Sequence, residues 1–123
     1  ERVRIKKGDF LLDDLGEQAY DAVFLSNIIH NLSDRDNVKL LEKIWKTLRS
    51  GGRVFIKDMM PNDRRDGPYY PLLFALTMLM FTESGDTYPA SQVREWLKEA
   101  GFVRITQKTV IRGESSVMTG SKK

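Results

Sequence analysis

The sequence contains no cysteine and only one histidine, His30, among its 123 residues. The absence of cysteine excludes disulfide bonds, thiolate zinc sites and a cysteine nucleophile. A metal site would therefore depend on carboxylates, and none of them cluster at the spacing of metal ligands. We expect no bound metal ion.

The chain also lacks a strong excess of one charge and a long hydrophobic run. Its 20 basic and 17 acidic residues are interspersed, which is typical of a solvated surface rather than of a nucleic-acid-binding face. The apolar run at residues 72–81 is too short to span a bilayer, and the N-terminus has no continuous apolar core of a signal peptide. We therefore expect a cytoplasmic protein that binds neither nucleic acid nor a membrane.

The composition that remains is that of one globular domain. Hydrophobic residues make up 41% and charged residues 30%, and a chain of this length buries enough surface for one core. The chain begins with glutamate and enters strand-like residues at once, which is typical of a fragment. We expect residues 1–123 to form a single unit.

Apolar periodicity and turn residues predict an α/β fold with a mainly parallel sheet. Ser33 has the features of a helix N-cap, the apolar spacing continues to Leu48, and Gly51 is expected to end that helix. The complete set of expected strands is residues 3–5, 21–25, 54–56, 102–110 and 115–121. Two further helices are expected over residues 70–81 and 89–100, and the last two strands are expected to be antiparallel.

His30 lies between a buried strand and the start of a helix, in the segment SNIIHNLSD. Ligands of parallel sheets bind beyond the carboxyl ends of the strands, and an imidazole can take up a proton near neutral pH. This position favours a general base. The alternative is a polar residue that satisfies backbone groups just before a helix.

Four segments in this order carry a resemblance to a known family. They are GDF at residues 8–10, DAVFLSNIIHNLSDRD at 21–36, LRSGGRVFIKDMMP at 48–61 and YPASQVREWLKEAGF at 88–102. Together they resemble the C-terminal part of class I S-adenosylmethionine-dependent O-methyltransferases that act on plant phenolics, bacterial polyketides and hydroxyindoles. The resemblance implies a three-layer Rossmann-like methyltransferase sheet that is incomplete here. It also implies methyl transfer from S-adenosylmethionine to a hydroxyl of a small molecule.

The resemblance implies roles for individual residues. His30 matches the family's general base, and Asp58 matches the acid that positions its imidazole. Without the resemblance, the position of Asp58 indicates a residue at the end of a strand that caps the next loop. Met78 and Thr82 match the segment that lines the acceptor pocket, although residues 72–81 could equally be plain core.

Cofactor contacts are implied at the ends of two strands. Asp9 matches the residue that hydrogen-bonds the adenine of S-adenosylmethionine, and Phe10 the residue that packs against the ring. Ser26 or Asn27 matches the residue that approaches the cofactor after the next strand. Taken alone, Gly-Asp is ordinary turn chemistry and Phe10 would be a core residue.

The chain departs from the family pattern at several positions. Asn31 and Leu32 stand where many members have aspartate and tryptophan, and Thr87 stands where plant enzymes carry a second glutamate. None of the nine glycines forms the glycine-rich turn that holds the methionine end of the cofactor. A non-catalytic association module is therefore an alternative function, and methylation of carbon or nitrogen is a weaker one.

The missing first strands would leave the strand at residues 21–25 as a bare apolar edge, which favours association. We expect one of three outcomes: pairing of residues 3–5 with residues 22–25, self-association across the edge, or a partner that supplies the missing half.

Overall fold

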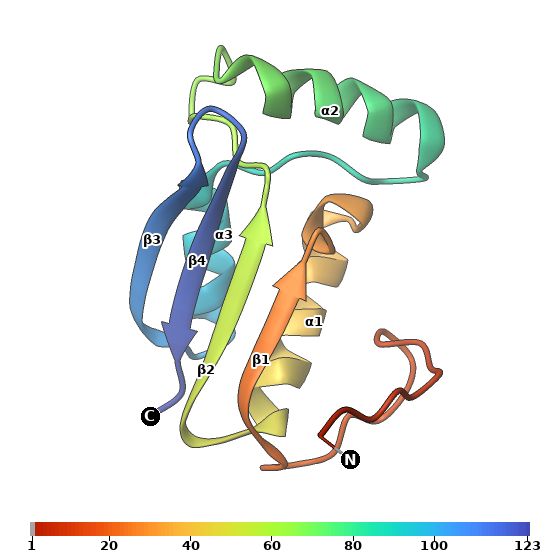
Figure 1. Cartoon of the computed structure of the whole chain (residues 1–123), viewed down its shortest axis with the longest axis vertical. Helices are drawn as coiled ribbons and strands as arrows, with labels where there is room; N and C mark the ends of the chain where they lie inside the picture. Colours follow the sequence, from red (N-terminus) through yellow and green to blue (C-terminus); the bar gives the residue numbers. More distant parts are fainter. Residues whose placement is uncertain (1) are drawn as a thin grey trace.

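The computed structural model describes residues 2–123, which form one sheet with helices on one of its faces (Figure 1). The elements in chain order are the strand β1 (Tyr20–Ser26), the short 3-10 helix η1 (Ile29–Asn31), α1 (Asp34–Thr47), β2 (Leu48–Asp58), α2 (Tyr69–Phe81), α3 (Ala90–Glu99), β3 (Val103–Ile111) and β4 (Ser115–Ser121). The predicted α/β class is confirmed.

The sheet has the strand order β1-β2-β4-β3 and is mixed. The β1 and β2 strands are parallel because α1 connects them across one face of the sheet. The β3 and β4 strands form an antiparallel hairpin, as predicted, and β4 also runs antiparallel to β2. The expectation of a mainly parallel sheet is therefore wrong, since only one of the three strand pairs is parallel.

The strand predicted at residues 3–5 does not form. Val3 and Ile5 are 70% and 95% exposed, and the segment pairs with no other strand. Direct pairing of residues 3–5 with β1 is therefore also wrong. Alternating apolar residues predict a strand only where a neighbouring strand supplies backbone partners, and β1 pairs only with β2 among the described residues.

The core lies between the sheet and the helices α1 and α3. Ser33 caps α1 as predicted, because its hydroxyl accepts a hydrogen bond from the Asp36 N–H at 3.1 Å. The helix ends at Thr47 and not at Gly51, because Leu48 is extended and begins β2. The fully buried side chains that join the helices to the sheet include Leu41, Ile44, Val54, Ile56, Val93, Leu97 and Met118.

The helix α2 lies across the end of the sheet toward which β1 and β2 point (Figure 1). It is apolar on all sides, and only Pro71 and Met78 are buried. The other face of the sheet carries no helix from residues 2–123, so the three-layer arrangement is present only in part. Within those residues, no helix is both long and apolar enough to cross a membrane.

Candidate active site

The turn after β1 is shaped by Asn27, which has a left-handed backbone (φ 57°). Asparagine tolerates this conformation better than most residues. The Asn27 N–H donates to the Lys57 carbonyl oxygen at 2.9 Å, and the Asn27 Oδ1 accepts from the Lys57 Nζ at 3.1 Å. These contacts tie the end of β1 to the end of β2 and direct the chain into η1, which carries His30.

His30 is held by Asp58, the last residue of β2. The distance between His30 Nδ1 and Asp58 Oδ1 is 2.8 Å, and the His30 backbone N–H donates to Asp58 Oδ2 at 3.4 Å. Asp58 Oδ1 also accepts from the Met59 N–H at 2.8 Å. The two residues are 6% and 1% exposed. The structure therefore satisfies a deeply buried carboxylate with three donors, two of them from His30.

This arrangement selects one form of the neutral imidazole. Because Asp58 accepts at Nδ1, the proton lies on that nitrogen and the lone pair on Nε2. Nε2 has no hydrogen-bond partner among residues 2–123. Such a ring can take a proton from a hydroxyl that reaches Nε2.

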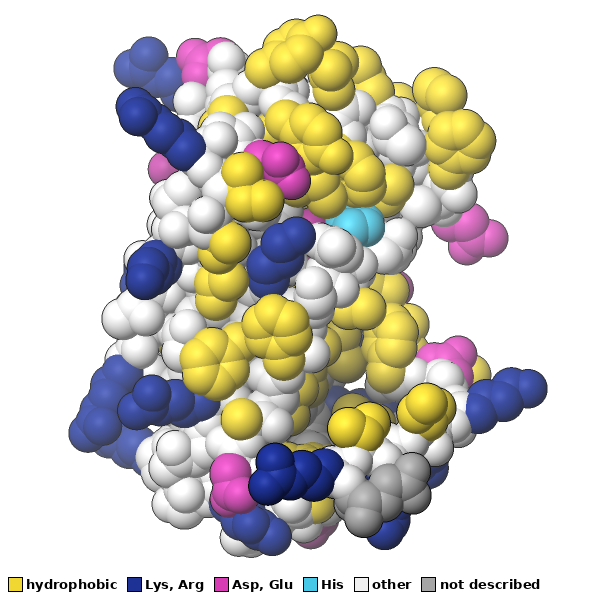
Figure 2. Space-filling view, in the orientation of Figure 1, with side chains coloured by type: hydrophobic (Ala, Val, Ile, Leu, Met, Phe, Trp, Pro, Cys, Tyr) yellow, Lys and Arg dark blue, Asp and Glu magenta, His cyan; other side chains and the backbone are white. Residues whose placement is uncertain are grey.

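The imidazole opens onto a pocket of about 270 Å³ at the carboxyl ends of β1 and β2. Phe74 of α2 contacts the imidazole edge-on with ring centroids 4.8 Å apart, and Tyr70 stacks on Phe74 at 6.4 Å. Figure 2 shows the imidazole at the surface, directly below hydrophobic side chains. The residues that line the pocket are Asn27, His30, Lys57, Met59, Tyr70, Phe74 and Glu114.

A loop after α2 supports His30 from its backbone side. The Asp86 N–H donates to the His30 carbonyl oxygen at 3.0 Å. The Gly85 N–H donates to Thr82 Oγ1 at 2.8 Å, and a side chain at Gly85 would collide with that hydroxyl and with the His30 carbonyl oxygen. Thr82 therefore supports the loop behind His30 and does not line the His30 pocket, and Met78 is buried outside that pocket.

Tyr88 supports Leu32, the residue that follows the short helix η1. Its hydroxyl donates to the Leu32 carbonyl oxygen at 2.6 Å. Burial of the phenol, together with the nearby carboxylates of Asp86 and Asp34, raises the pKa of Tyr88 to about 12. The phenol therefore stays protonated and keeps its hydrogen bond throughout the neutral range.

The structure does not bring Asp9 and Phe10 to this site. Asp9 Oδ1 accepts from the N–H groups of Leu11 and Leu12 at 2.8 and 3.3 Å, which is ordinary turn chemistry. The Phe10 carbonyl oxygen accepts from Lys43 Nζ of α1. The pocket of about 300 Å³ beside Asp9 and Phe10 shares no residue with the His30 pocket. Asn27, in contrast, lines the His30 pocket, and Ser26 is the residue before it at the end of β1.

Five residues that line the pocket are absent from the predicted site residues: Lys57, Met59, Tyr70, Phe74 and Glu114. Lys57 immediately precedes Asp58. Its position at the end of a strand is the sequence feature that could have identified it as a pocket residue. Glu114 is the last turn residue before β4, and the antiparallel pairing of β4 with β2 brings it to the carboxyl end of β2. Thr87, where a glutamate would stand in plant enzymes, is buried, and its hydroxyl donates to the Pro71 carbonyl oxygen at 3.0 Å.

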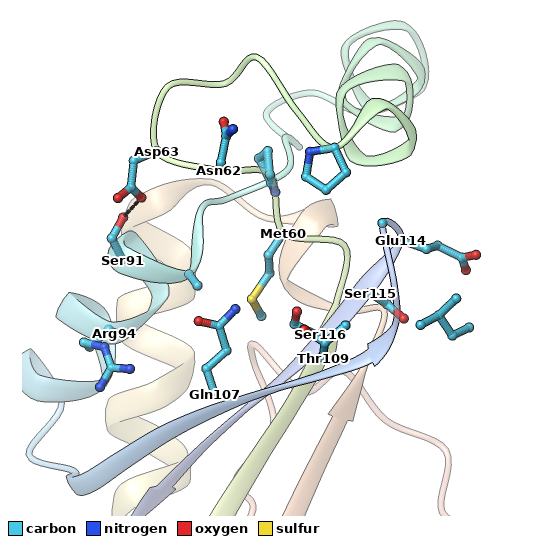
Figure 3. Close-up of a pocket in the computed structure, with 15 residues that line it drawn as sticks. Met60, Asn62, Asp63, Ser91, Arg94, Gln107, Thr109, Glu114, Ser115 and Ser116 are labelled. Carbon is cyan, nitrogen blue, oxygen red and sulfur yellow. Dashed lines mark hydrogen bonds between the residues drawn. The ribbon is translucent and has the colours of Figure 1, made fainter.

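A larger cavity of about 510 Å³ lies between the N-terminus of α3 and the β3–β4 hairpin (Figure 3). Its polar wall includes Ser91, which donates to Asp63, together with Gln107 and Arg94. It contains none of the predicted site residues. Glu114 adjoins both cavities, and in Figure 3 its side chain points away from the larger one. No group of three or more potential metal ligands occurs in the described part of the chain.

Comparison with known proteins identifies the family. Residues 1–103 match the O-methyltransferase domain. The 3-hydroxy-5-methyl-1-naphthoate 3-O-methyltransferase of Streptomyces sahachiroi is 32% identical over 98% of this chain, which spans 35% of that protein. The L-tyrosine C(3)-methyltransferase of Streptomyces lavendulae is 33% identical over 83% of this chain and 28% of that protein.

The structure of human N-acetylserotonin methyltransferase in complex with S-adenosylmethionine has a TM-score of 0.86 and 27% identity. The match covers 95% of this chain and 33% of that one. The chain thus spans about a third of the length of the relatives that it matches. The whole of its sheet and helix layer corresponds to part of a methyltransferase fold, and the chain belongs to the O-methyltransferase family.

Proposed function

We propose that this chain supplies the proton-accepting half of an O-methyltransferase active site. In this proposal His30 Nε2 takes the proton from the hydroxyl of a small acceptor, while Asp58 keeps the proton of Nδ1 in place. The observation that carries the proposal is the 2.8 Å contact between Nδ1 and Asp58 Oδ1 at the edge of a pocket. A positioned base of this kind contributes about 10²–10⁴-fold to a rate.

The methyl donor in this proposal is S-adenosylmethionine, which supplies a methyl group on a sulfonium and leaves as a neutral thioether. Asn27 lines the His30 pocket, so Asn27 and the preceding Ser26 are placed to meet the reactive end of the donor. Asp9 and Phe10 do not adjoin that pocket, and Asp9 Oδ1 is already occupied by two backbone donors. The donor set of this chain therefore fits only part of the cofactor, and we propose that a partner or a second copy supplies the rest.

We propose an aromatic hydroxyl compound as the acceptor. Tyr70 and Phe74 give the pocket an aromatic wall that suits a flat ring. The naphthoate methyltransferase named above acts on a ring hydroxyl. The tyrosine methyltransferase named above acts on a ring carbon, so methylation of carbon remains a competing outcome, in which His30 need not act as a base.

The test is a transfer assay with S-adenosylmethionine and a panel of small phenols, with and without the N-terminal part of a relative added in trans. We expect S-adenosylhomocysteine and a methyl ether as products. His30→Gln should lower turnover by about 10²–10⁴-fold and leave cofactor affinity unchanged. Lys39→Gln, on the exposed side of α1, serves as the matched control. Unchanged turnover in His30→Gln would refute the base, and a C-methylated product would refute O-methylation.

The second candidate is a non-catalytic association module of the same fold. The observation that favours it is the separation of Asp9 and Phe10 from the His30 pocket. Titration calorimetry of the chain with S-adenosylmethionine distinguishes the two candidates. Tight binding to the isolated chain would contradict the module, whereas no binding, even with an added partner half, would contradict the catalytic proposal.

A further inference from the structure

Lys57 places a positive charge beside His30 that no carboxylate neutralises. It is the next-to-last residue of β2 and lies in register with Ser26 of β1. Its Nζ donates to Asn27 Oδ1 at 3.1 Å. None of the ion pairs formed among residues 2–123 includes Lys57. An ammonium group has three N–H donors, so two remain for a ligand after Asn27 has taken one.

One side-chain hydrogen bond, to Asn27, orients this ammonium group before any ligand arrives. Asn27 holds Lys57 through its side chain and through its own N–H, which donates to the Lys57 carbonyl oxygen at 2.9 Å. Donors that are already oriented cost little reorganisation when charge develops on a substrate. Lys57 therefore has the features of an electrostatic partner rather than those of a free surface lysine.

None of the other charged or titratable groups around the pocket forms an ion pair with Lys57, so its ammonium group is available to a ligand oxygen. The pocket is lined by His30, Lys57, Tyr70 and Glu114, and Asp58 lies behind the imidazole. Asp58 is saturated by donors from His30 and Met59. Glu114 comes from the turn between β3 and β4 and makes no ion pair with Lys57. In a pocket of about 270 Å³, a ligand oxygen that reaches His30 also lies within the range of the Lys57 charge.

We propose that Lys57 is a catalytic residue that binds the acceptor oxygen as its proton leaves, and that the acceptor is a phenol or enol which reacts as its anion. This inference rests on the proposed function and names its substrate class. In the step, the O–H bond of the acceptor breaks and the proton goes to His30 Nε2. The electron pair stays on the oxygen, which accepts an N–H hydrogen bond from Lys57.

The experiment uses the whole 123-residue chain with 4-nitrophenol as the probe and needs no methyl donor. His30 is the only histidine, so its imidazole proton resonance reports binding without ambiguity. The visible absorbance of the phenolate reports the ionised fraction of the bound probe. We expect bound 4-nitrophenol to ionise about one pH unit below the free compound. Lys57→Gln should abolish this shift, Lys57→Arg should keep most of it, and Lys39→Gln should keep all of it.

Two results of the 4-nitrophenol experiment would overturn the inference, and a third comes from the methyl-transfer assay. One is an ionisation shift in Lys57→Gln as large as in the unchanged chain, with Lys57→Arg also unchanged. The other is a His30 resonance that does not respond to 4-nitrophenol at any concentration. The proposed function fails separately: a chain that ionises the probe through Lys57 but transfers no methyl group refutes the function alone. Methyl transfer with kcat and KM unchanged in Lys57→Gln refutes the inference alone.

Discussion

The surroundings of His30 give the two nitrogens of its imidazole different roles. Its Nδ1 donates to Asp58, and its Nε2 faces the pocket without a partner among residues 2–123. Phe74 packs edge-on against the ring and limits its rotation. Asp58 and Phe74, both far from His30 in the sequence, thus determine which imidazole nitrogen can accept a proton. The first prediction concerns this nitrogen.

Replacing Asp58 with asparagine should change the tautomer of His30. An amide oxygen can still accept, but the amide nitrogen would face one of the N–H groups that now donate to the carboxylate. We expect a mixture of Nδ1–H and Nε2–H forms and a loss of about 1–3 kcal/mol in the free energy of unfolding. Long-range 15N–1H correlation of the single imidazole measures the tautomer. Asp86→Asn is the control, since that carboxylate pairs with Arg65. A ring that stays fully Nδ1–H in Asp58→Asn would contradict the prediction.

Tyr88 makes the free energy of unfolding depend on pH in the alkaline range. The pKa of its buried phenol is raised to about 12, whereas an unfolded tyrosine titrates near 10. Below about pH 10 both states hold the proton, and the full stabilisation is present. Between about pH 10 and 12 the unfolded chain has lost a proton that the folded chain keeps, so the free energy of unfolding falls as the pH rises.

Replacing Tyr88 with phenylalanine should remove this pH dependence. The loss over that interval is about 2–3 kcal/mol in the unchanged chain and should be absent in Tyr88→Phe. At neutral pH the variant should be about 1 kcal/mol less stable, because the Leu32 carbonyl oxygen loses its shorter hydrogen bond and keeps only the one from Asn37 Nδ2 at 3.4 Å. Urea denaturation at a series of pH values measures both effects, with the exposed Tyr69→Phe as the control. An equal alkaline loss in Tyr88→Phe and in the unchanged chain would show that another group is responsible.

At the residue scale, sequence reasoning led to His30 and Asp58, and the structure brings them into hydrogen-bonding contact. Their catalytic roles remain predictions. Lys57 lies within one of the four segments that carry the resemblance, but the resemblance implies no role for it, and Glu114 lies outside all four segments. Glu114 was hidden further by topology, since it reaches the pocket only because β4 runs antiparallel to β2.

At the scale of the elements, the end of α1 is stabilised by Lys122, which directly follows β4 in the sequence. Lys122 Nζ donates to the carbonyl oxygens of Trp45 and Leu48 at 2.8 and 2.7 Å and lies 4.1 Å from the centroid of the Trp45 ring. A cation at a helix C-terminus satisfies carbonyl groups that have no partner within the helix. This contact joins α1 to the segment after β4.

Replacing Lys122 with methionine should destabilise the fold by about 1–2 kcal/mol, because two part-buried carbonyl oxygens lose a charged donor while the aliphatic chain is kept. Urea denaturation followed by tryptophan fluorescence measures the loss. Lys123→Met is the matched control, since its side chain is exposed. Equal stability of the two variants would contradict the role assigned to Lys122.

Helices were easier to predict than strands in this chain. The helices α1, α2 and α3 were all anticipated, because a helix makes its backbone hydrogen bonds within itself. The end of α1 was placed at Gly51, whereas long-range contacts of Leu48 in β2 end it at Thr47. The alternating residues 3–5 form no strand, since a strand depends on a partner that no local pattern can reveal.

At the scale of the whole molecule, one face of the sheet carries no helix from residues 2–123, and the edge strand β1 is apolar. Val23 and Leu25 of β1 pack against the core, whereas Phe24 between them is 63% exposed on the other side. The edge of β1 away from β2 has no strand partner among residues 2–123. The resemblance predicted such an edge. Which surface covers it could not be predicted, because the chain spans about a third of the length of its relatives.

The remaining expectation is that the chain associates through β1. From Ala22 to Leu25 the strand β1 carries no charge and pairs in regular register with β2, whereas Asp21 and a register irregularity lie at its start. An apolar edge of this kind favours pairing with another chain, and a lysine at its centre opposes such pairing. We therefore expect the chain to self-associate at micromolar concentration and Phe24→Lys to weaken the association about tenfold or more. Sedimentation velocity over a concentration series measures the change. Phe81→Lys, which removes an equally exposed aromatic side chain (74%) from α2, is the matched control. Association lost in Phe81→Lys but kept in Phe24→Lys would assign the contact to α2, and a monomer at all concentrations would exclude self-association and leave a partner chain as the occupant of the edge.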